Sequence, residues 1–193
     1  MPRVKTFNEE DVLERAMILF WEKGYYATSM QELVLRTGIN RASLYDTFGG
    51  KEELFNRVFN RYRESSRVRV IEHLKRFPTV KEGFLQLFEN AVDETLADEK
   101  KKGCFAVNTA SGLLPGDEKM RDVLKENKLQ FEEVFYNHLK TGVDSGEIAP
   151  EKDLHEMASL IFILYSGIRV TAKMNPDKES MMAAIRKGLE FLD

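Results

Sequence analysis

Residues 28–54 of this 193-residue chain read TSMQELVLRTGINRASLYDTFGGKEEL, and this stretch decides the fold of the N-terminal part. Thr28 and Gln31 have the spacing of a capping box, which predicts a helix that begins here and runs to about Arg36. Gly38 follows in a tight turn, where a glycine can adopt the left-handed conformation that ends a helix. The pattern therefore predicts one short helix with a sharp end.

A second short helix follows the turn. Asn40 is a favourable N-cap and predicts a helix from Arg41 to about Thr47, which stops at Gly49-Gly50. Two short helices joined by a glycine-containing turn form a helix-turn-helix, whose second helix can lie in the major groove of DNA. The apolar side chains expected to hold these helices together are Met30, Leu33, Val34, Ile39, Leu44 and Phe48.

The polar side chains around this turn suit contacts with DNA. Arg41 can donate two hydrogen bonds to O6 and N7 of guanine, whereas phosphates repel Asp46 unless it accepts from a cytosine amine. Lys51 begins a long helix, where free backbone N–H groups favour an anion. Arg3 and Lys5 are expected to add phosphate contacts from an N-terminal arm. The candidate DNA-binding residues are Thr28, Asn40, Arg41, Ser43, Tyr45, Asp46, Thr47 and Lys51.

The charge of the chain is divided unevenly along its length. The net charge is −3, but residues 1–76 carry 14 Lys and Arg against 11 Asp and Glu, which gives +3, whereas the remainder carries 15 against 21, which gives −6. A mildly basic front and an acidic rear favour an anionic partner at the N-terminal end.

Composition and periodicity predict an all-α fold in two domains. Apolar residues make up 42% of the chain and charged residues 32%, only five prolines occur, and alternating β-branched runs are missing. We expect a helix-turn-helix domain over residues 1–50 and a larger helical domain over 51–193, with the helix 51–76 shared as a connector. Further helices are expected over about 8–24, 79–98, 104–113, 117–141, 151–174 and 177–192.

The location expected from the sequence is the cytoplasm. The single cysteine excludes an intramolecular disulfide, and the N-terminus has no signal-peptide apolar region. The longest apolar run, residues 160–165, is too short to span a membrane.

The helix-turn-helix segment resembles that of a known family. Residues 28–34, 37–48 and 51–54 are similar to the DNA-binding segment of the TetR/AcrR family of bacterial transcriptional repressors, and Gly24-Tyr25 fits its usual lead-in. The resemblance, which covers roughly residues 8–60, implies a homodimer that binds a palindromic operator in double-stranded DNA and is released by a small-molecule effector. Asn40 stands where serine is commoner and Asp46 where tyrosine or histidine is commoner, which bears on the operator sequence.

The last two helices carry apolar stripes suited to pairing across a two-fold axis. The alternative from periodicity alone is that these residues form core within one chain. The candidate dimer residues are Leu154, Met157, Ile161, Leu164, Ile168, Met182, Ile185 and Leu189.

The C-terminal domain also holds the candidate effector site. Gly103-Cys104 resembles the start of a short helix in a subset of the family that senses electrophiles or oxidants through this cysteine, and Lys100, Lys101 and Lys102 would favour its thiolate. The alternative is that Cys104 packs as a small apolar residue. Aromatic stripes such as these are also more often core than pocket. The candidate ligand-binding residues are Phe84, Phe88, Cys104, Asn108, Phe131, Phe135, Phe162 and Tyr165.

Enzyme motifs are missing from the sequence. His155-Glu156 begins an HExxH pattern, but Ser159 stands where the second zinc ligand is needed, and there is no P-loop or nucleophile elbow. We expect no enzymatic activity, cofactor or metal. Three hypotheses remain: a ligand-responsive repressor, a thiol-based sensor that uses Cys104, and an all-α interaction scaffold without DNA binding.

Overall fold

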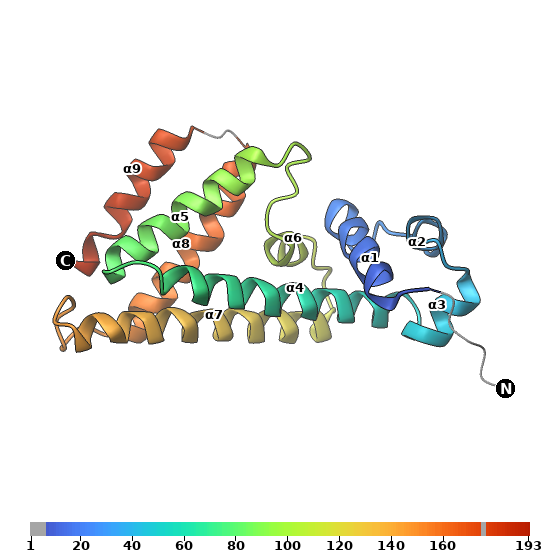
Figure 1. Ribbon diagram of the computed structural model, residues 1–193, viewed down its shortest axis with the longest axis horizontal. Coiled ribbons are helices and arrows are strands. Elements are labelled where there is room, and N and C mark those ends of the chain that lie inside the picture. The colour runs from blue at the N-terminus through green and yellow to red at the C-terminus, as the bar shows by residue number, and fades with distance from the viewer. Residues whose placement is uncertain (1–6, 175–176) are drawn as a thin grey trace. The chain divides into compact units, whose positions relative to one another are not determined.

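The computed structural model describes residues 7–174 and 177–193, and these residues are helical with no strand (Figure 1). They form nine α-helices and one short 3-10 helix, so the predicted all-α fold is confirmed. The predicted arm with Arg3 and Lys5 lies outside the described residues.

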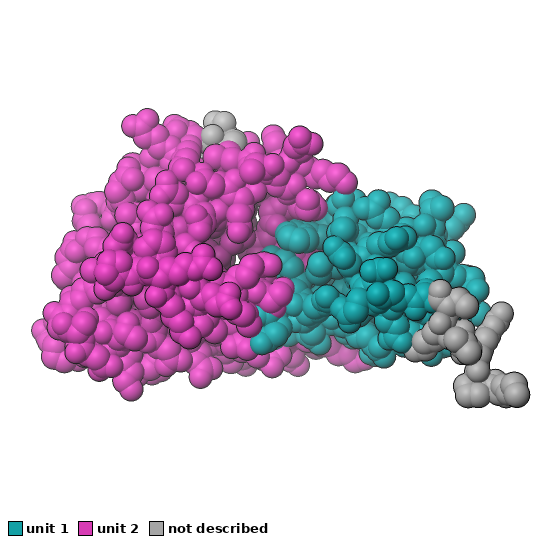
Figure 2. Space-filling model, in the orientation of Figure 1, with its two compact units in different colours: residues 1–64 teal, residues 65–193 magenta. Residues whose placement is uncertain are grey.

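The chain divides into two compact units, residues 1–64 and residues 65–193 (Figure 2). The division falls inside one long helix, α4 (Lys51–Leu74), so this helix contributes residues to both units. The sequence predicted a division at residue 50 with this helix as a shared connector.

Unit 1 consists of α1 (Glu9–Lys23), α2 (Met30–Thr37), α3 (Arg41–Phe48) and the first part of α4. Its helices enclose a core in which Phe20 meets Phe55 edge-to-face, with ring centroids 5.1 Å apart. Helices of eight residues are not stable alone, so α2 and α3 depend on this packing. Of the apolar residues expected to join them, Leu33, Ile39, Leu44 and Phe48 are buried, and Met30 and Val34 are half-buried.

The ends of these short helices follow local signals. Asn8 caps α1, and its side chain accepts from the Glu10 N–H at 2.9 Å. The capping box of α2 is formed by Ser29 and Glu32, so the prediction that placed it at Thr28 and Gln31 was wrong by one residue. Gly38 ends α2 with φ of +76°, a conformation that favours glycine, and its N–H donates to the Val34 carbonyl at 3.0 Å.

Unit 2 is a bundle around α8 (Leu154–Met174). This helix packs against α5 (Val80–Ala97) and α7 (Glu118–Asp144), and α9 (Lys178–Gly188) packs against α5 and α8 (Figure 1). The short helix α6 (Phe105–Ser111) contacts α7 and α8, and a 3-10 turn (Glu190–Leu192) ends the chain.

Two predicted boundaries in unit 2 were displaced. α7 runs through Gly142, where a loop was expected, because this glycine is packed rather than terminal: a Cβ here would lie 2.8 Å from Ile148 Cδ1 and 2.9 Å from Val80 Cγ2. α8 begins at Leu154, three residues later than predicted, and the Asp153 carboxylate accepts from the N–H groups of its first turn.

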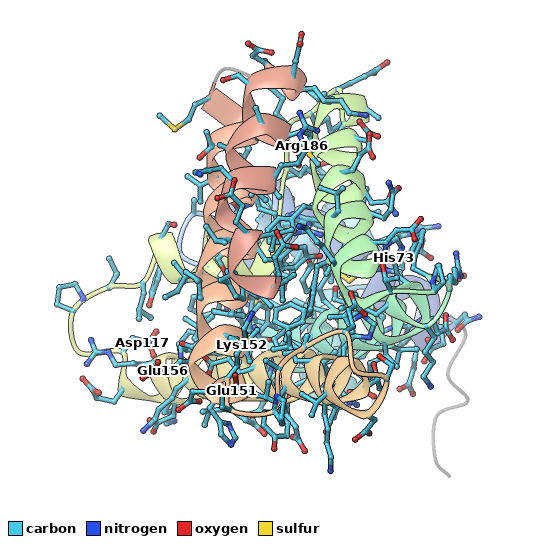
Figure 3. The ribbon with its side chains drawn as sticks, turned by 90° about the vertical axis from the view of Figure 1, so that its left-hand side faces the viewer. His73, Asp117, Glu151, Lys152, Glu156 and Arg186 are labelled. Atoms are coloured by element: carbon cyan, nitrogen blue, oxygen red, sulfur yellow. The ribbon has the colours of Figure 1, made fainter. Side chains whose placement is uncertain are left out.

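Side-chain bonds connect one end of this bundle. Glu147, in the loop after α7, accepts from the Val80 and Lys81 N–H groups at 2.7 and 2.9 Å at the start of α5. Lys152, labelled in Figure 3 just before α8, donates to the Phe191 carbonyl at 2.8 Å. The loop after α7 is therefore bonded to the start of α5, and the start of α8 to the end of the chain.

α8 is long and apolar enough to cross a membrane by length and composition alone. One side of it is packed in unit 2, where Ile161, Tyr165 and Ile168 are buried in the core. This packing is typical of the central helix of a bundle.

Candidate functional site

The start of α3 is fixed by Asn40. Its side-chain oxygen accepts from the Ser43 N–H at 2.8 Å, which satisfies one free N–H group of the first helical turn. Asn40 itself is exposed, and its side-chain oxygen is engaged in capping. The cap holds the first residues of α3, those that meet base edges in a helix-turn-helix, in a fixed orientation.

One face of α3 is polar and exposed. Arg41, Tyr45 and Asp46 lie on this face with Ala42, whereas Leu44 and Phe48 are buried on the opposite face. The Arg41 guanidinium lies 5.7 Å from the centroid of the Tyr45 ring, one helical turn away. The predicted residues Ser43 and Thr47 are half-buried at its edges.

Tyr45 also meets the beginning of α4. A Cβ on Gly50 would lie 3.1 Å from Tyr45 Cε1, so the ring rests directly on this backbone. The next residue, Lys51, starts α4, and its ammonium lies 4.4 Å from the centroid of the Tyr25 ring. Partial burial lowers the pKa of Lys51, whereas Glu32 acts to raise it. The polar face of α3 and the N-terminus of α4 thus form one surface, which we call the α3–α4 surface (Arg41, Tyr45, Asp46 and Lys51).

The N-terminus of α2 has a different electrostatic character. The Glu32 carboxylate accepts from the Ser29 N–H and hydroxyl, both at 2.9 Å, and forms an ion pair with Lys23. The Lys23 contact, followed by the bonds from Ser29, lowers the pKa of Glu32 to about 2. This helix terminus therefore already holds a carboxylate of its own.

Thr28 occupies a position that differs from the one expected. Its side chain is 1% exposed, and its hydroxyl donates to the Gly24 carbonyl at 2.7 Å. The hydroxyl predicted to meet a phosphate is engaged in holding the connection between α1 and α2.

The aromatic residues predicted to line an effector site do gather in unit 2. Phe131 lies 6.3 Å from Phe162 and 6.5 Å from Tyr165 between ring centroids, and Tyr165 lies 5.8 Å from Phe88. The cluster lies inside unit 2, because all members except the half-buried Phe162 are buried. It consists of Phe84, Phe88, Phe131, Phe135, Phe162 and Tyr165.

Cys104 and Asn108 lie at the border of this cluster. Cys104 is the half-buried N-cap of α6, and its side chain makes no capping hydrogen bond. It is near enough to Tyr165 to influence the pKa of that phenol. Within residues 7–174 and 177–193, no group of three His, Cys, Asp or Glu side chains could hold a metal ion.

Sequence reasoning missed two residues beside the cluster, Arg169 and Lys173. Both lie on α8, and Lys173 donates to the Asn108 side-chain oxygen at 3.0 Å. The available signal was their spacing: they continue the line of Phe162 and Tyr165, so two cations follow an apolar stripe that faces inward.

The predicted dimer residues lie mostly inside a single chain. Met157, Ile161, Ile168, Met182, Ile185 and Leu189 are buried in the core of unit 2, and Leu154 and Leu164 are partly buried against it. The structure exposes a second apolar line on α8 instead, spaced alternately by three and four residues as in a coiled coil. We call it the α8 stripe: Leu160, Ile163, Gly167, Val170 and Met174.

Comparison with known proteins gives consistent matches along the chain. Residues 12–58 match the family model of bacterial regulatory proteins of the tetR family, and residues 82–187 match the tetracyclin repressor-like C-terminal domain. The chain is 32% identical to YezE of Bacillus subtilis (strain 168), an uncharacterized HTH-type transcriptional regulator, over 100% of both chains. It is 30% identical to the HTH-type transcriptional repressor ComR of Escherichia coli (strain K12), over 93% of this chain and 86% of ComR.

A solved structure agrees with these matches. A cysteine mutant of the TetR family transcriptional regulator CifR, complexed with 26-bp double-strand operator DNA, superposes with a TM-score of 0.87 at 29% identity. The superposition covers 97% of this chain and 98% of that one.

Proposed function

Because this chain belongs to the TetR family of bacterial regulatory proteins, we propose that it is a cytoplasmic transcriptional repressor that binds a palindromic operator as a homodimer and is released by a small molecule. Its role is regulatory, not enzymatic. The observation that carries the proposal is the α3–α4 surface, which joins an exposed arginine on a short helix to a lysine at a helix N-terminus.

On the α3–α4 surface, Arg41 and Lys51 have different roles in DNA binding. Arg41, in the first turn of α3, enters the major groove and donates to a guanine edge. Lys51 and the free N–H groups at the start of α4 bind a phosphate of the DNA. This contact fixes the register of unit 1, the DNA-binding head, on the duplex. Tyr45 lies between Arg41 and Lys51, and its hydroxyl contacts the phosphate backbone of the DNA.

Two heads must act together to read a palindrome. Recognition helices that read successive major grooves on one face of DNA lie about 34–36 Å apart, which requires a two-fold dimer. The α8 stripe supports this assembly, since it leaves apolar residues exposed at coiled-coil spacing. Gly167, in the middle of the stripe, has nothing within 4 Å of its Cβ position, so a partner helix can approach closely there.

The effector releases the repressor from DNA by shifting the population between two arrangements of the dimer. One arrangement of the dimer holds both heads at operator spacing, and an effector that binds another arrangement better lowers DNA affinity by that difference in binding free energy. The helix α4 is the element through which such a change passes, because it belongs to both units.

The test is selection of bound duplexes from a random-sequence DNA pool, followed by a salt titration on the enriched sequence. We expect a palindrome, and an affinity that falls steeply as salt rises. No enrichment from protein refolded free of small molecules, together with no salt-dependent DNA association, would instead support the interaction scaffold.

A second candidate is a repressor that senses electrophiles or oxidants through Cys104. The observation that favours it is the position of this thiol, which is half-buried, is not engaged in capping, and is separated from a run of three lysines by Gly103 alone. Cys104→Ser should abolish release of the operator by N-ethylmaleimide or peroxide and leave operator binding unchanged; release that survives the substitution would exclude this candidate.

A further inference from the structure

Two cations of α8 hold neutral oxygen atoms at the border of the aromatic cluster. The Arg169 guanidinium donates to the Tyr165 hydroxyl at 2.5 Å and lies 4.6 Å from the centroid of that ring. The Lys173 ammonium donates to the Asn108 side-chain oxygen at 3.0 Å. The Arg169 side chain is only 15% exposed, so its charge is largely removed from water.

The oxygen atoms that receive these bonds carry no negative charge. Burial, the largest influence, raises the pKa of Tyr165, so its phenol stays protonated at neutral pH. The Asn108 amide is held in place by its own bond to the Lys102 carbonyl at 2.6 Å. Charges buried in proteins are normally paired with an opposite charge, and these two acceptors do not supply one.

The carboxylates nearby offset this charge incompletely. Glu94, on α5, reaches Arg169 at 3.5 Å, but its side chain is 66% exposed to water. Asp98 is engaged with Lys102 at 2.9 Å. Among the described residues, no carboxylate lies within ion-pair distance of Lys173.

The spacing of the cations allows one anion to meet both. Residues four apart on a helix have Cβ atoms about 5–6 Å apart, within reach of the two oxygens of a single acidic group. Tyr165 and Phe162 continue the same line of α8, and Phe88 and Phe131 lie beside the Tyr165 ring. A cationic end followed by aromatic rings matches a molecule with an acidic head and an apolar body.

We propose that the effector is an amphipathic acid whose carboxylate or phosphate head binds Arg169 and Lys173 and whose apolar body packs among Phe162, Tyr165 and their neighbouring rings. This inference rests on the proposed function, in which unit 2 binds a small molecule. The acid displaces the Asn108 side chain from Lys173 and removes a bond between α6 and α8.

The experiment compares acids with neutral molecules of the same shape. Isothermal titration without DNA measures the binding of 2-naphthoate, 2-naphthyl phosphate and decanoate, with 2-naphthamide and decanamide as neutral controls. We expect at least one acid to bind tenfold or more tightly than its amide. The comparison of 2-naphthoate with 2-naphthyl phosphate shows whether a carboxylate or a phosphate group is preferred. Lys173→Gln and Arg169→Gln should each remove this preference, whereas Lys173→Arg should keep it.

The matched control is Lys187→Gln, because Lys187 is exposed on α9 and pairs with Glu190. It should leave the preference unchanged, and thermal unfolding of each variant shows that it is folded. Amides that bind as tightly as acids, glutamine variants that keep the preference, or no binding by any probe would overturn the inference. Binding of acids by a protein that selects no operator would refute the proposed function instead, so the two failures are distinct.

Discussion

Helix α3 of unit 1 and helix α8 of unit 2 arrange their polar and apolar side chains in opposite ways. On α3 of unit 1, Arg41 and Tyr45 face solvent, whereas the apolar Leu44 and Phe48 lie inside. In unit 2, Arg169 turns inward and the apolar Ile163 is 60% exposed. In the function that we propose, α3 presents its polar face to the polyanion DNA, whereas unit 2 binds an acid inside and a second copy of the chain outside.

The largest expected effect tests whether the two units are also separate in stability. Phe48→Ala removes a fully buried ring from the core of unit 1, which should lower the free energy of unfolding by about 3–5 kcal/mol. Trp21, the single tryptophan, packs edge-to-face on Tyr62 in unit 1, so its fluorescence reports this unit alone. We expect the fluorescence transition in urea to move to lower concentration while much of the far-UV helical signal persists. Coincident shifts of both signals would show that the units unfold together.

The next effect separates base reading from phosphate binding within unit 1. Arg41→Ala should weaken binding to the selected operator by about 1–3 kcal/mol, because a bidentate contact with a base edge is lost, and should relax selectivity at one base pair. Fluorescence anisotropy on operator and random duplexes measures both. Equal losses on the two duplexes would remove Arg41 from the base-reading residues.

Lys51→Ala is the matched comparison for this variant. It should weaken binding to every duplex alike and reduce the slope of log K against log salt by about 0.9, the value for one phosphate contact. A loss confined to the operator would reverse the roles assigned to the two cations.

A smaller effect tests the outer face of unit 2. Ile163→Lys places a charge in the α8 stripe and should raise the dimer dissociation constant at least tenfold, about 1.4 kcal/mol. Sedimentation velocity over a concentration series measures the change. Leu129→Lys, at an exposed leucine of α7, is the control and should leave dimerisation unchanged; equal weakening by both would place the interface elsewhere.

The smallest effect is a pH dependence in unit 1. The pKa of Glu32 is about 2 in the folded chain against an ordinary 4.5, so its stabilising contribution is present above about 4.5 and is lost as the pH falls from there toward 2. Glu32→Gln should be less stable than the wild type at pH 7 and lose less stability between pH 5 and pH 3. Urea unfolding followed by Trp21 fluorescence measures this, and parallel pH profiles would contradict it. Glu133→Gln, at an exposed residue of α7, is the control.

Much of unit 1 could be predicted because its signals are local. Asn8, Asn40 and Gly38 each act on backbone groups within four residues, so their positions in the sequence determine where a helix begins or ends. The polar face of α3 follows from helical spacing alone. The error at Thr28 had a tertiary cause: Thr28 and Ser29 are both suitable N-caps, and the burial of Thr28 leaves the role to Ser29.

Unit 2 shows what spacing does not determine. α8 has apolar residues on two faces, and periodicity does not say that Ile161 and Ile168 are buried in the core while Ile163 faces out. Which face of α8 is buried depends on how the other helices of the same chain pack against it. Arg169 and Lys173 were missed for the same reason, since a charged side chain on an apolar helix is expected to face water.

The continuity of α4 has a consequence for recombination between relatives. A head cut at residue 50 would lose Leu54, Phe55 and Phe59, which are buried in its core, so an exchange of heads must splice inside the helix, near residue 64. At that point the number of residues determines the rotation of the following residues about the axis of α4. One inserted residue turns them by about 100° and advances them by about 1.5 Å. Chimeras that preserve the residue count should bind operators, and those that gain or lose one residue should fold but fail to align both heads on the same duplex.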